Sequence, residues 1–189
     1  MNDKNHFKII SIIFFITICL IYLLTNCKST IFNKPIWPCP YNQNRLKNLY
    51  IKEASGKYTS QSLFDIYSFT HISHGILLFY ILYYFHGYKR YNSMIYYALF
   101  YEIIWEIIEN TPYVIDRYRK ASNLSRNYPG DSIINSIGDV ITMSIGFIIT
   151  WYYPKYGIFL LLLNELALYY LIKDNLITNI YQVFFKTIQ

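Results

Sequence analysis

The sequence predicts an all-α integral membrane protein, a helical bundle of about five transmembrane helices followed by a C-terminal interfacial helix. Hydrophobic residues make up 54% of the 189 residues and charged residues only 15%, a balance that is unusual for a soluble domain. The apolar residues gather in segments near the ~17–25 residues that a bilayer requires. Acidic residues recur at helical spacing inside these segments. The length has room for one compact domain, so residues 1–189 are treated as a single membrane domain.

The five predicted spans are separated by polar or proline-containing segments. Lys4 and Lys8 precede the first span, a layout that a signal peptide shares, but no small-residue cleavage site follows and we favour an uncleaved helix. After the fifth span, residues 175–189 alternate apolar and polar residues at helical spacing, which predicts a helix on the membrane surface. The spans are predicted at residues 9–25, 66–87, 93–110, 132–153 and 156–172.

The segment between the first two spans is a long polar loop, residues 26–64. Three prolines between residues 35 and 40 exclude a helix at that point. Cys27 and Cys39 pair with each other if this loop faces an oxidising compartment, and remain free thiols if it does not. The sequence leaves both alternatives open.

Positive charge is concentrated in the loops. The net charge is +6, and the Lys and Arg residues lie in short segments between the apolar ones, which favours contact with anionic lipid headgroups over contact with nucleic acid. Membrane lipids are therefore the expected partners. Residues 111–130 are predicted to be an arginine-rich loop, because Pro112 makes a continuation of the preceding helix unfavourable.

Alternation of the spans places three polar helix ends on one side of the membrane. The second and fourth spans enter from the side of the 26–64 loop, and the third span leaves on that side. Residues three or four apart share a helix face, so their polar groups form stripes that converge on one half of the bilayer. The converging residues are His71 and His74 from the second span, Glu102, Glu106 and Glu109 from the third, and Asp131, Asn135 and Asp139 from the fourth.

These residue types indicate a functional site. Imidazoles and carboxylates are the usual ligands of Zn, Mn and Fe, so His71 and His74 are the predicted ligands of a divalent metal, the expected cofactor. Buried carboxylates also serve as general bases, and arginine suits bidentate binding of phosphate. The predicted catalytic residues are Glu106, Glu109, Asp131 and Asp139, and the predicted substrate-binding residues are Arg117, Arg119, Asn135 and Ser132.

Simpler structural roles stay open for several of these residues. A histidine pair at the start of a helix often only hydrogen-bonds to neighbouring loops. Glu109 and Asp131 can be helix caps that face water, and either Asp131 or Ser132 is a natural N-cap for the fourth span. Gly75 and Gly146 are expected to mark close contacts between helices.

A series of ordered motifs runs along most of the chain. They are Ser60-Gln61 with Asp65, Tyr67-Ser68-Phe69-Thr70-His71, His74-Gly75, Trp105-Glu106, Glu109-Asn110, Asp116-Arg117-Tyr118-Arg119, Gly130-Asp131-Ser132, Asn135-Ser136 with Asp139, Gly146-Phe147, Glu165 and Asp174-Asn175-Leu176. In these motifs the chain resembles the multi-pass alphaproteobacterial membrane proteins of the family called domain of unknown function 2585. The resemblance implies an integral protein of the inner membrane, and it transfers no catalytic residue because the family has no assigned activity.

One motif departs from that family. Relatives tend to carry Cys-x-Cys-Gly after the first helix, whereas this chain has Trp37-Pro38-Cys39-Pro40. The departure argues against any role that requires two adjacent thiols.

Three functions are compatible with these features. The leading hypothesis is a membrane-embedded, metal-assisted hydrolase or transferase that acts on a lipid-linked or phosphate-bearing substrate. The second is a small proton-coupled transporter, in which Glu102, Glu106 and Glu165 form a relay through the bilayer. The third is a non-catalytic membrane assembly factor, in which the polar cluster only holds helices together. Polar stripes confined to one half of the membrane favour the enzyme, whereas the deeper Glu102 and Glu165 favour transport.

The span count predicts that the two termini lie on opposite sides of the membrane. Lys4 and Lys8 favour a cytoplasmic N-terminus, which makes the polar cluster face outward, although most Lys and Arg residues lie on the opposite side and favour the reverse orientation. Compartment-sensitive reporters fused to each end should therefore give opposite signals in intact cells. Two reporters in the same compartment would contradict an odd number of spans.

Overall fold

Helices dominate the part of the chain that the computed structural model describes, namely residues 30–31, 34–35, 49–56, 58–86 and 91–186. The predicted all-α class is confirmed there. The helices are α2 (Ser68–His86), α3 (Tyr91–Glu109), α4 (Pro112–Ala121), α5 (Ile133–Tyr152), α6 (Gly157–Ile172) and α7 (Leu176–Phe184), and the two-residue strands are β1 (Thr30–Ile31), β2 (Lys34–Pro35), β3 (Tyr50–Ile51) and β4 (Phe64–Asp65).

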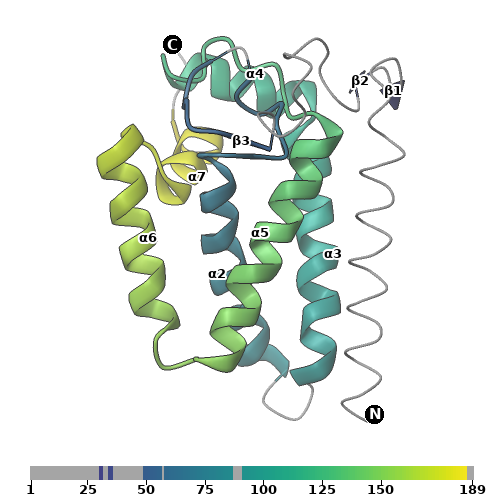
Figure 1. Cartoon of the computed structure of the whole chain (residues 1–189), viewed down its shortest axis with the longest axis vertical. Helices are drawn as coiled ribbons and strands as arrows, with labels where there is room; N and C mark the ends of the chain where they lie inside the picture. Colours follow the sequence, from purple (N-terminus) through teal and green to yellow (C-terminus); the bar gives the residue numbers. More distant parts are fainter. Residues whose placement is uncertain (1–29, 32–33, 36–48, 57, 87–90, 187–189) are drawn as a thin grey trace.

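Helix α2 is the centre of the bundle. It contacts α3, α5 and α6, and α3 also contacts α5. These four helices run side by side, and α4, α7 and β3 gather at the end where α2 begins (Figure 1). Because consecutive long helices alternate in direction, the start of α5 and the end of α3 lie at that same end. This is the arrangement that the alternation of spans predicts.

Two glycines allow α2 and α5 to approach each other closely. A Cβ atom at Gly75 of α2 would collide with the backbone carbonyl of Met143, and one at Gly146 of α5 would collide with the carbonyl of Ile72. Each helix therefore needs a glycine where the other helix presents its backbone. The predicted role of Gly75 and Gly146 as close helix contacts is confirmed.

Below this contact, apolar side chains close the bundle. Phe79 from α2, Met94 from α3 and Phe147 from α5 are each 1% exposed or less, and they belong to one buried cluster. The rings of Phe79 and Phe147 meet edge to face at 5.6 Å. This cluster makes one end of the bundle apolar and confines the polar residues to the other end.

The outer surface of the bundle is apolar as well. Helix α3 buries Glu102 and Glu106, which are 1% and 6% exposed, and turns Ile107 outward at 66% exposed. In α6, Phe159 and Leu166 are 64% and 68% exposed. A helix with charged residues inside and isoleucines outside has the reverse of the polarity that water selects.

Two helical segments are long and apolar enough to cross a membrane, residues 133–152 and 154–172. They correspond to the predicted spans 132–153 and 156–172. The predicted spans 66–87 and 93–110 coincide with α2 and α3, although these two helices do not meet the same criterion of length and hydropathy. The predicted span 9–25 lies outside the described residues. The five-span arrangement therefore stays a prediction.

The predicted loop at residues 111–130 is wrong for its first half, which forms α4. Pro112 ends α3, as expected, but it then occupies the first turn of a new helix, where its missing N–H is not needed. The side chain of Thr111 caps α4 by accepting a hydrogen bond from the Val114 N–H. Tyr118 and Val183 pack with Val114, so α4 lies against α7.

The glycine contact generates a stability prediction. Gly146→Val should lower the free energy of unfolding by about 1–3 kcal/mol, because the new side chain must displace the backbone of Ile72. For a chain of this size the thermal midpoint should fall by roughly 2–10 °C. Ile145→Val is the matched control, since Ile145 is 44% exposed on the outward face of α5. Equal midpoints for the two variants in detergent would refute the tight contact.

Candidate functional site

The start of α2 is fixed by a capping box. The carboxylate of Asp65 accepts hydrogen bonds from the N–H groups of Tyr67 and Ser68 at 2.8 and 3.1 Å. In return, the hydroxyl of Ser68 accepts from the N–H of Asp65 at 3.1 Å. This reciprocal pair satisfies donors at the end of the helix. It also sets where His71, three residues further on, points.

Asp65 carries a second structural bond. Its Oδ2 accepts from the N–H of Ser60 at 2.6 Å, and Ser60 adopts a left-handed backbone conformation with φ 63°. Burial raises the pKa of Asp65 to about 6, against the opposing effect of these backbone N–H groups. Asp65 is thus the residue that joins the preceding loop to the first turn of α2.

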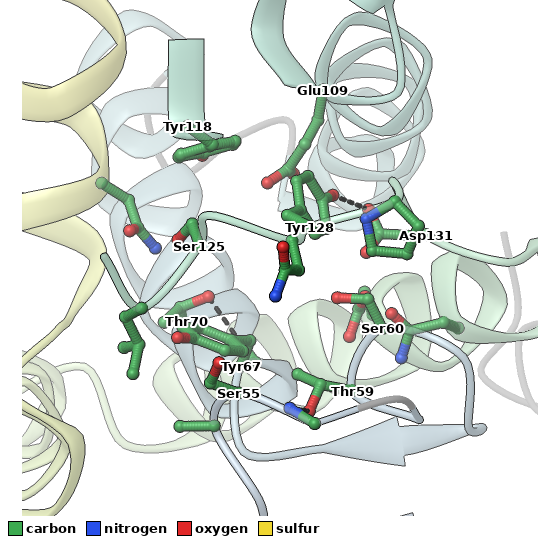
Figure 2. Close-up of a pocket in the computed structure, with 18 of the residues that line it drawn as sticks. Ser55, Thr59, Ser60, Tyr67, Thr70, Glu109, Tyr118, Ser125, Tyr128 and Asp131 are labelled. Carbon is green, nitrogen blue, oxygen red and sulfur yellow. Dashed lines mark hydrogen bonds between the residues drawn. The ribbon is translucent and has the colours of Figure 1, made fainter. Parts of the chain in front are cut away.

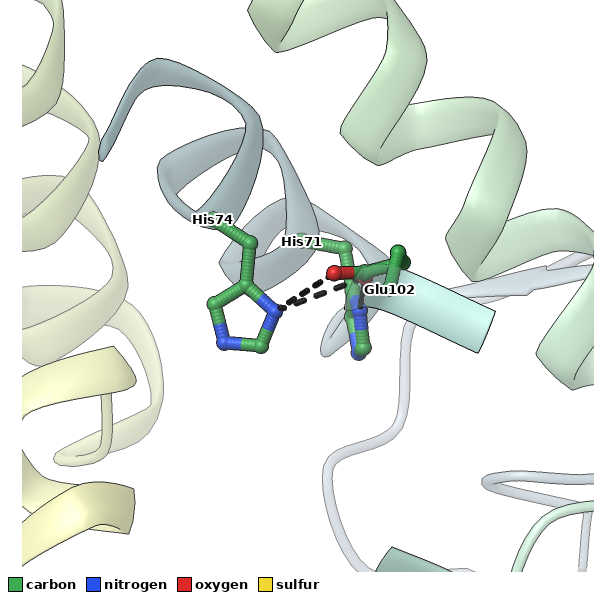
Figure 3. Close-up of side chains that lie close together, drawn as sticks. All are labelled: His71, His74 and Glu102. Atoms are coloured by element: carbon green, nitrogen blue, oxygen red, sulfur yellow. Dashed lines mark hydrogen bonds and ion pairs between the residues drawn. The ribbon is translucent and has the colours of Figure 1, made fainter. Parts of the chain in front are cut away.

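His71 is the centre of a charged cluster. Its Nδ1 lies 2.6 Å from Glu102 Oε1 and 3.5 Å from Glu106 Oε1, and its Nε2 lies 3.9 Å from Asp139 Oδ2. His74 Nδ1 lies 3.3 Å from Glu102 Oε2. Figure 3 shows the two imidazoles and Glu102 close together. The cluster joins α2, α3 and α5.

Two carboxylates of this cluster are buried without sufficient partners. Glu106 is 6% exposed and Asp139 is 4% exposed. In the described structure, both carboxylate oxygens of Glu106 lack a hydrogen-bond partner, and so does Oδ1 of Asp139. A buried unpaired carboxylate is strongly unfavourable unless it is neutralised or binds a cation. His71, Glu106 and Asp139 each offer a ligand atom within 4.8 Å of the others, and so do His71, His74 and Glu102.

A pocket of about 500 Å³ adjoins the cluster. Its walls come from the 54–70 segment, the end of α3, α4, the 124–131 segment and the start of α5, with Asn179 of α7 (Figure 2). Hydroxyl groups of Tyr67, Thr70, Tyr118 and Tyr128 belong to residues on this wall. Of the residues predicted from sequence, the pocket is lined by His71, Glu109, Asp131, Asn135 and Asp139.

Asp131 is held in a hydrogen-bond network at the mouth of α5. Its Oδ2 accepts from the Tyr128 hydroxyl at 2.7 Å and from the Asn110 amide at 3.1 Å. The N–H of Asp131 donates to the Asn110 side-chain carbonyl at 2.8 Å. Burial, together with the charges of Asp131 and Glu109, raises the pKa of Tyr128, so its hydroxyl remains a donor. Ser132, and not Asp131, is the N-cap of α5.

Comparison with known proteins finds a family that matches a segment of the chain containing the whole site, and individual relatives. Residues 34–187 match the family described as "Protein of unknown function (DUF2585)". The chain belongs to this family. It is 34% identical over 146 residues to a UPF0314 protein of Rhizobium meliloti, covering 77% of this chain and 72% of that one. It is 32% identical over 150 residues to a UPF0314 protein of Sphingopyxis alaskensis, covering 77% and 75%.

Other relatives match over a shorter segment. A UPF0314 protein of Agrobacterium fabrum is 35% identical over 122 residues, which is 64% of this chain and 61% of the relative. No solved structure matches the chain. The DUF2585 match includes every residue of the cluster and the pocket, and it confirms the resemblance drawn from the ordered motifs.

Two predicted substrate-binding residues of this DUF2585 protein support the pocket wall from behind. The Asn135 amide donates to the Ser62 carbonyl at 2.8 Å. The Ser132 hydroxyl donates to the Gln61 carbonyl at 3.2 Å. Both residues therefore hold the 60–62 segment against α5, and of the two only Asn135 lines the pocket. Their role in binding a substrate stays a prediction.

The structure does not bring Arg117 and Arg119 to the pocket. Arg117 donates to the carbonyl of Lys186 at 3.0 Å, and Arg119 donates to the carbonyl of Tyr128 at 2.6 Å. The formation of α4 accounts for this difference, because a helix fixes the direction of each side chain where a loop would leave it open. The described residues that line the pocket include Glu109, Asp131 and Asp139 and no lysine or arginine.

Sequence reasoning about chemistry missed the 54–70 wall of the pocket and the central position of Glu102. The residues Ser60-Gln61 and Tyr67 to Thr70 were singled out only through the family resemblance. The structural feature that marks this wall is the run from Thr59 to Ser62, four polar residues that are all buried. Buried polar residues outside a helix require specific partners, but a sequence does not reveal which loop residues are buried.

Asp174 is a further buried carboxylate near the pocket. It is 2% exposed and accepts from the N–H of Asn175 at 2.9 Å. The amide of Asn179, oriented to donate, lies 3.1 and 3.3 Å from its two oxygens. Burial raises the pKa of Asp174 to about 6, and the charge of Glu165 acts in the same direction. Its charged form is therefore disfavoured in the folded state.

This shift predicts a pH-dependent variant. The folded pKa lies above the unfolded value, so the stability contributed by protonated Asp174 is complete below pH ~4 and is lost as pH rises through about 6. Asp174→Asn should therefore stabilise the protein at pH 7.5 by about 1–3 kcal/mol and have little effect at pH 4. Thermal unfolding at both pH values, with exposed Asp116→Asn as control, tests this. A loss of stability at pH 7.5 would contradict it.

Proposed function

We propose that this DUF2585 protein is a multi-pass inner-membrane enzyme that carries out hydrolysis or group transfer on a lipid-linked substrate. The observation that carries the proposal is a set of buried carboxylate oxygens without a hydrogen-bond donor, both of Glu106 and Oδ1 of Asp139, beside His71. His71 and Asp139 line a pocket of about 500 Å³. Functional sites are where a protein tolerates such unfavourable groups. A volume of this size accommodates a small molecule or a lipid headgroup.

The distribution of apolar surface supports a membrane location for all the long helices. Helix α3 presents isoleucines outward and glutamates inward, and α6 is exposed along most of its length, with Tyr170 at 79% and Leu171 at 62%. Intramembrane carboxylates face the interior of a bundle, which is where Glu102 and Glu106 lie. Helix α7 exposes Ile177 at 66% and Phe184 at 60% and buries Gln182, so it fits the interfacial position predicted for residues 175–189.

The groups on the pocket wall suit proton transfer. Asp139 and His71 line the pocket and face each other across 3.9 Å, so a water or substrate hydroxyl held there has a base within reach. Asp131 is oriented by Tyr128 and Asn110, which is the kind of supporting contact that holds a reacting group in place. Glu109 contributes a further carboxylate to the pocket lining.

The acidic lining of the pocket restricts which charged substrates can enter it. Because the described lining carries Glu109, Asp131 and Asp139 without a lysine or arginine, a phosphate group entering alone would be repelled. A phosphate-bearing headgroup therefore requires a bound cation in this pocket. Arg117 and Arg119 are predicted to hold the anion, but neither belongs to the described pocket lining, and both are bonded to backbone carbonyls.

The two other functions receive less support. In a proton relay, Glu165 would have to communicate with Glu102 and Glu106, but its oxygens accept from the Ser73 hydroxyl at 2.7 Å and the Ile177 N–H at 3.2 Å. Glu165 thereby links α6 to α2 and α7, which is a structural role. A purely structural cluster would have each carboxylate paired in this way, as Glu165 is and Glu106 is not.

The enzyme hypothesis predicts the effect of two conservative variants. Glu106→Gln and Asp131→Asn keep the size of the side chain and remove its charge, so both should abolish complementation of a deletion strain while protein level and thermal midpoint change little. Asp116→Asn is the control, because Asp116 is exposed and pairs with Lys120. Full complementation by both variants, or failure of both to accumulate in the membrane, would show that the cluster is structural.

A further inference from the structure

We infer that His71, Glu106 and Asp139 form a site for one divalent transition-metal ion, with Glu102 as the group that orients His71. The inference deepens the proposed function, on which its catalytic meaning rests. Binding itself is measurable without any activity.

The oxygens without a hydrogen-bond donor are positioned to bind a cation. Glu106 and Asp139 come from α3 and α5, and their ligand atoms lie with that of His71 within 4.8 Å of one another. Both oxygens of Glu106 and Oδ1 of Asp139 have no hydrogen-bond donor in the described structure. A single cation among the three side chains would satisfy these oxygens at once, which no nearby donor does.

The tautomer of His71 directs its other nitrogen to the same point. Glu102 Oε1 lies 2.6 Å from Nδ1, and an ionised carboxylate can only accept, so Nδ1 carries the hydrogen. In the neutral ring, Nε2 then presents a lone pair toward Asp139 Oδ2 at 3.9 Å. Two acceptors facing each other are unfavourable, whereas two ligands at ~2.0–2.2 Å from one tetrahedral ion lie roughly 3.3–3.6 Å apart, so a small closure of this gap would let both bind the ion.

Glu102 holds the His71 ring in place without itself binding the ion. Metal-bound histidine usually donates its second ring hydrogen to a carboxylate, which fixes the ring and strengthens the ligand. Glu102 is 1% exposed and also contacts His74 Nδ1 at 3.3 Å (Figure 3). The His74 ring in turn packs edge to face on Trp105 at 5.7 Å.

This assignment separates the two histidines that the sequence predicts as a ligand pair. His71, His74 and Glu102 form the other group with metal-ligand spacing, but Glu102 already receives both imidazoles. The ion is therefore assigned to the Nε2 side of His71, which Asp139 faces, and His74 supports Glu102. Glu106, whose Oε1 lies 3.5 Å from Nδ1 and whose ligand atom lies within 4.8 Å of the other two, completes the set. One imidazole with two carboxylates is a mixed nitrogen and oxygen set that suits Mn²⁺ or Zn²⁺.

The ion would lie at the wall of the pocket, since His71 and Asp139 line it. It would supply the positive charge that the acidic lining lacks, so that a phosphate oxygen or an attacking water can bind there. The cation thus explains how a pocket without arginine or lysine among its described lining residues accommodates an anionic headgroup.

The test measures binding in the purified full-length chain in detergent. Metal content is determined after purification, and the metal-depleted protein is titrated with Mn²⁺ and Zn²⁺ while free Mn²⁺ is followed by electron paramagnetic resonance. One ion should bind per chain. Glu106→Gln and Asp139→Asn should each lose stoichiometric binding, and Glu102→Gln should weaken it by about 10–100-fold.

A matched control and a stability signature separate binding from folding. Glu165→Gln removes a buried carboxylate whose two oxygens both accept hydrogen bonds, and it should leave the metal affinity unchanged. Glu106→Gln should abolish the rise in thermal midpoint that Mn²⁺ produces in the wild type, because the variant lacks one of the three ligands.

The inference fails if the wild type binds neither ion stoichiometrically, or if Glu106→Gln and Asp139→Asn bind as tightly as the wild type. Binding that Glu165→Gln removes equally would also overturn the assignment of ligands. The proposed function is decided separately by complementation. A site that binds metal in a protein whose Glu106→Gln variant complements fully would retain the inference and reject the enzyme.

Discussion

The close contact of α2 with α5 is the constraint on which the site depends. Gly75 and Gly146 let each helix press against the backbone of the other, and no larger residue fits at either position. Because α2 is also in contact with α3 and α6, the distance between its axis and α5 determines how the remaining helices pack. His71 lies one helical turn before Gly75, and Asp139 lies two turns before Gly146. The two side chains that face each other at the pocket wall are therefore placed by this contact.

The bundle is largely apolar on its outside and at one end, and its buried carboxylates gather at the other end. Phe79, Met94 and Phe147 fill the apolar end, while α3 turns its glutamates toward His71 and its isoleucines outward. This distribution has a clear consequence for the carboxylates. Glu102 and Glu106 are 1% and 6% exposed, so a charge on either must be balanced within the cluster. Glu102 achieves this with two imidazoles, and Glu106 does not.

The pocket and the cluster both contain carboxylates without a lysine or arginine among the described residues that form them. Asp131 and Glu109 make the wall acidic, and the arginines near them in sequence are engaged with backbone carbonyls of Lys186 and Tyr128. An anionic substrate and an acidic wall are compatible only through a cation. The oxygens beside His71 that lack a hydrogen-bond donor would provide a position for the cation that we propose.

Local sequence determined the long helices α2, α3, α5 and α6 and their faces, but not the short helix α4. The stripe of Glu102, Glu106 and Glu109 follows from helical periodicity, and the convergence of the polar helix ends follows from alternation of direction. Both are short-range properties, because a helix fixes the direction of its side chains from their spacing alone. The motifs were also sufficient to place the chain in the DUF2585 family, which the match over residues 34–187 established.

Tertiary packing decided the pairing. Which of two equivalent glutamates meets an imidazole depends on the rotation and depth of α3 relative to α2, and no spacing within one helix specifies that. The same is true of the loop residues that close the pocket and of Arg117 and Arg119, whose direction was set when Pro112 began a helix that packs on α7. The sequence by itself determined which groups lie on the inner faces of the helices, and only the folded structure decided which of them remain unpaired, because pairing is a property of distances between helices.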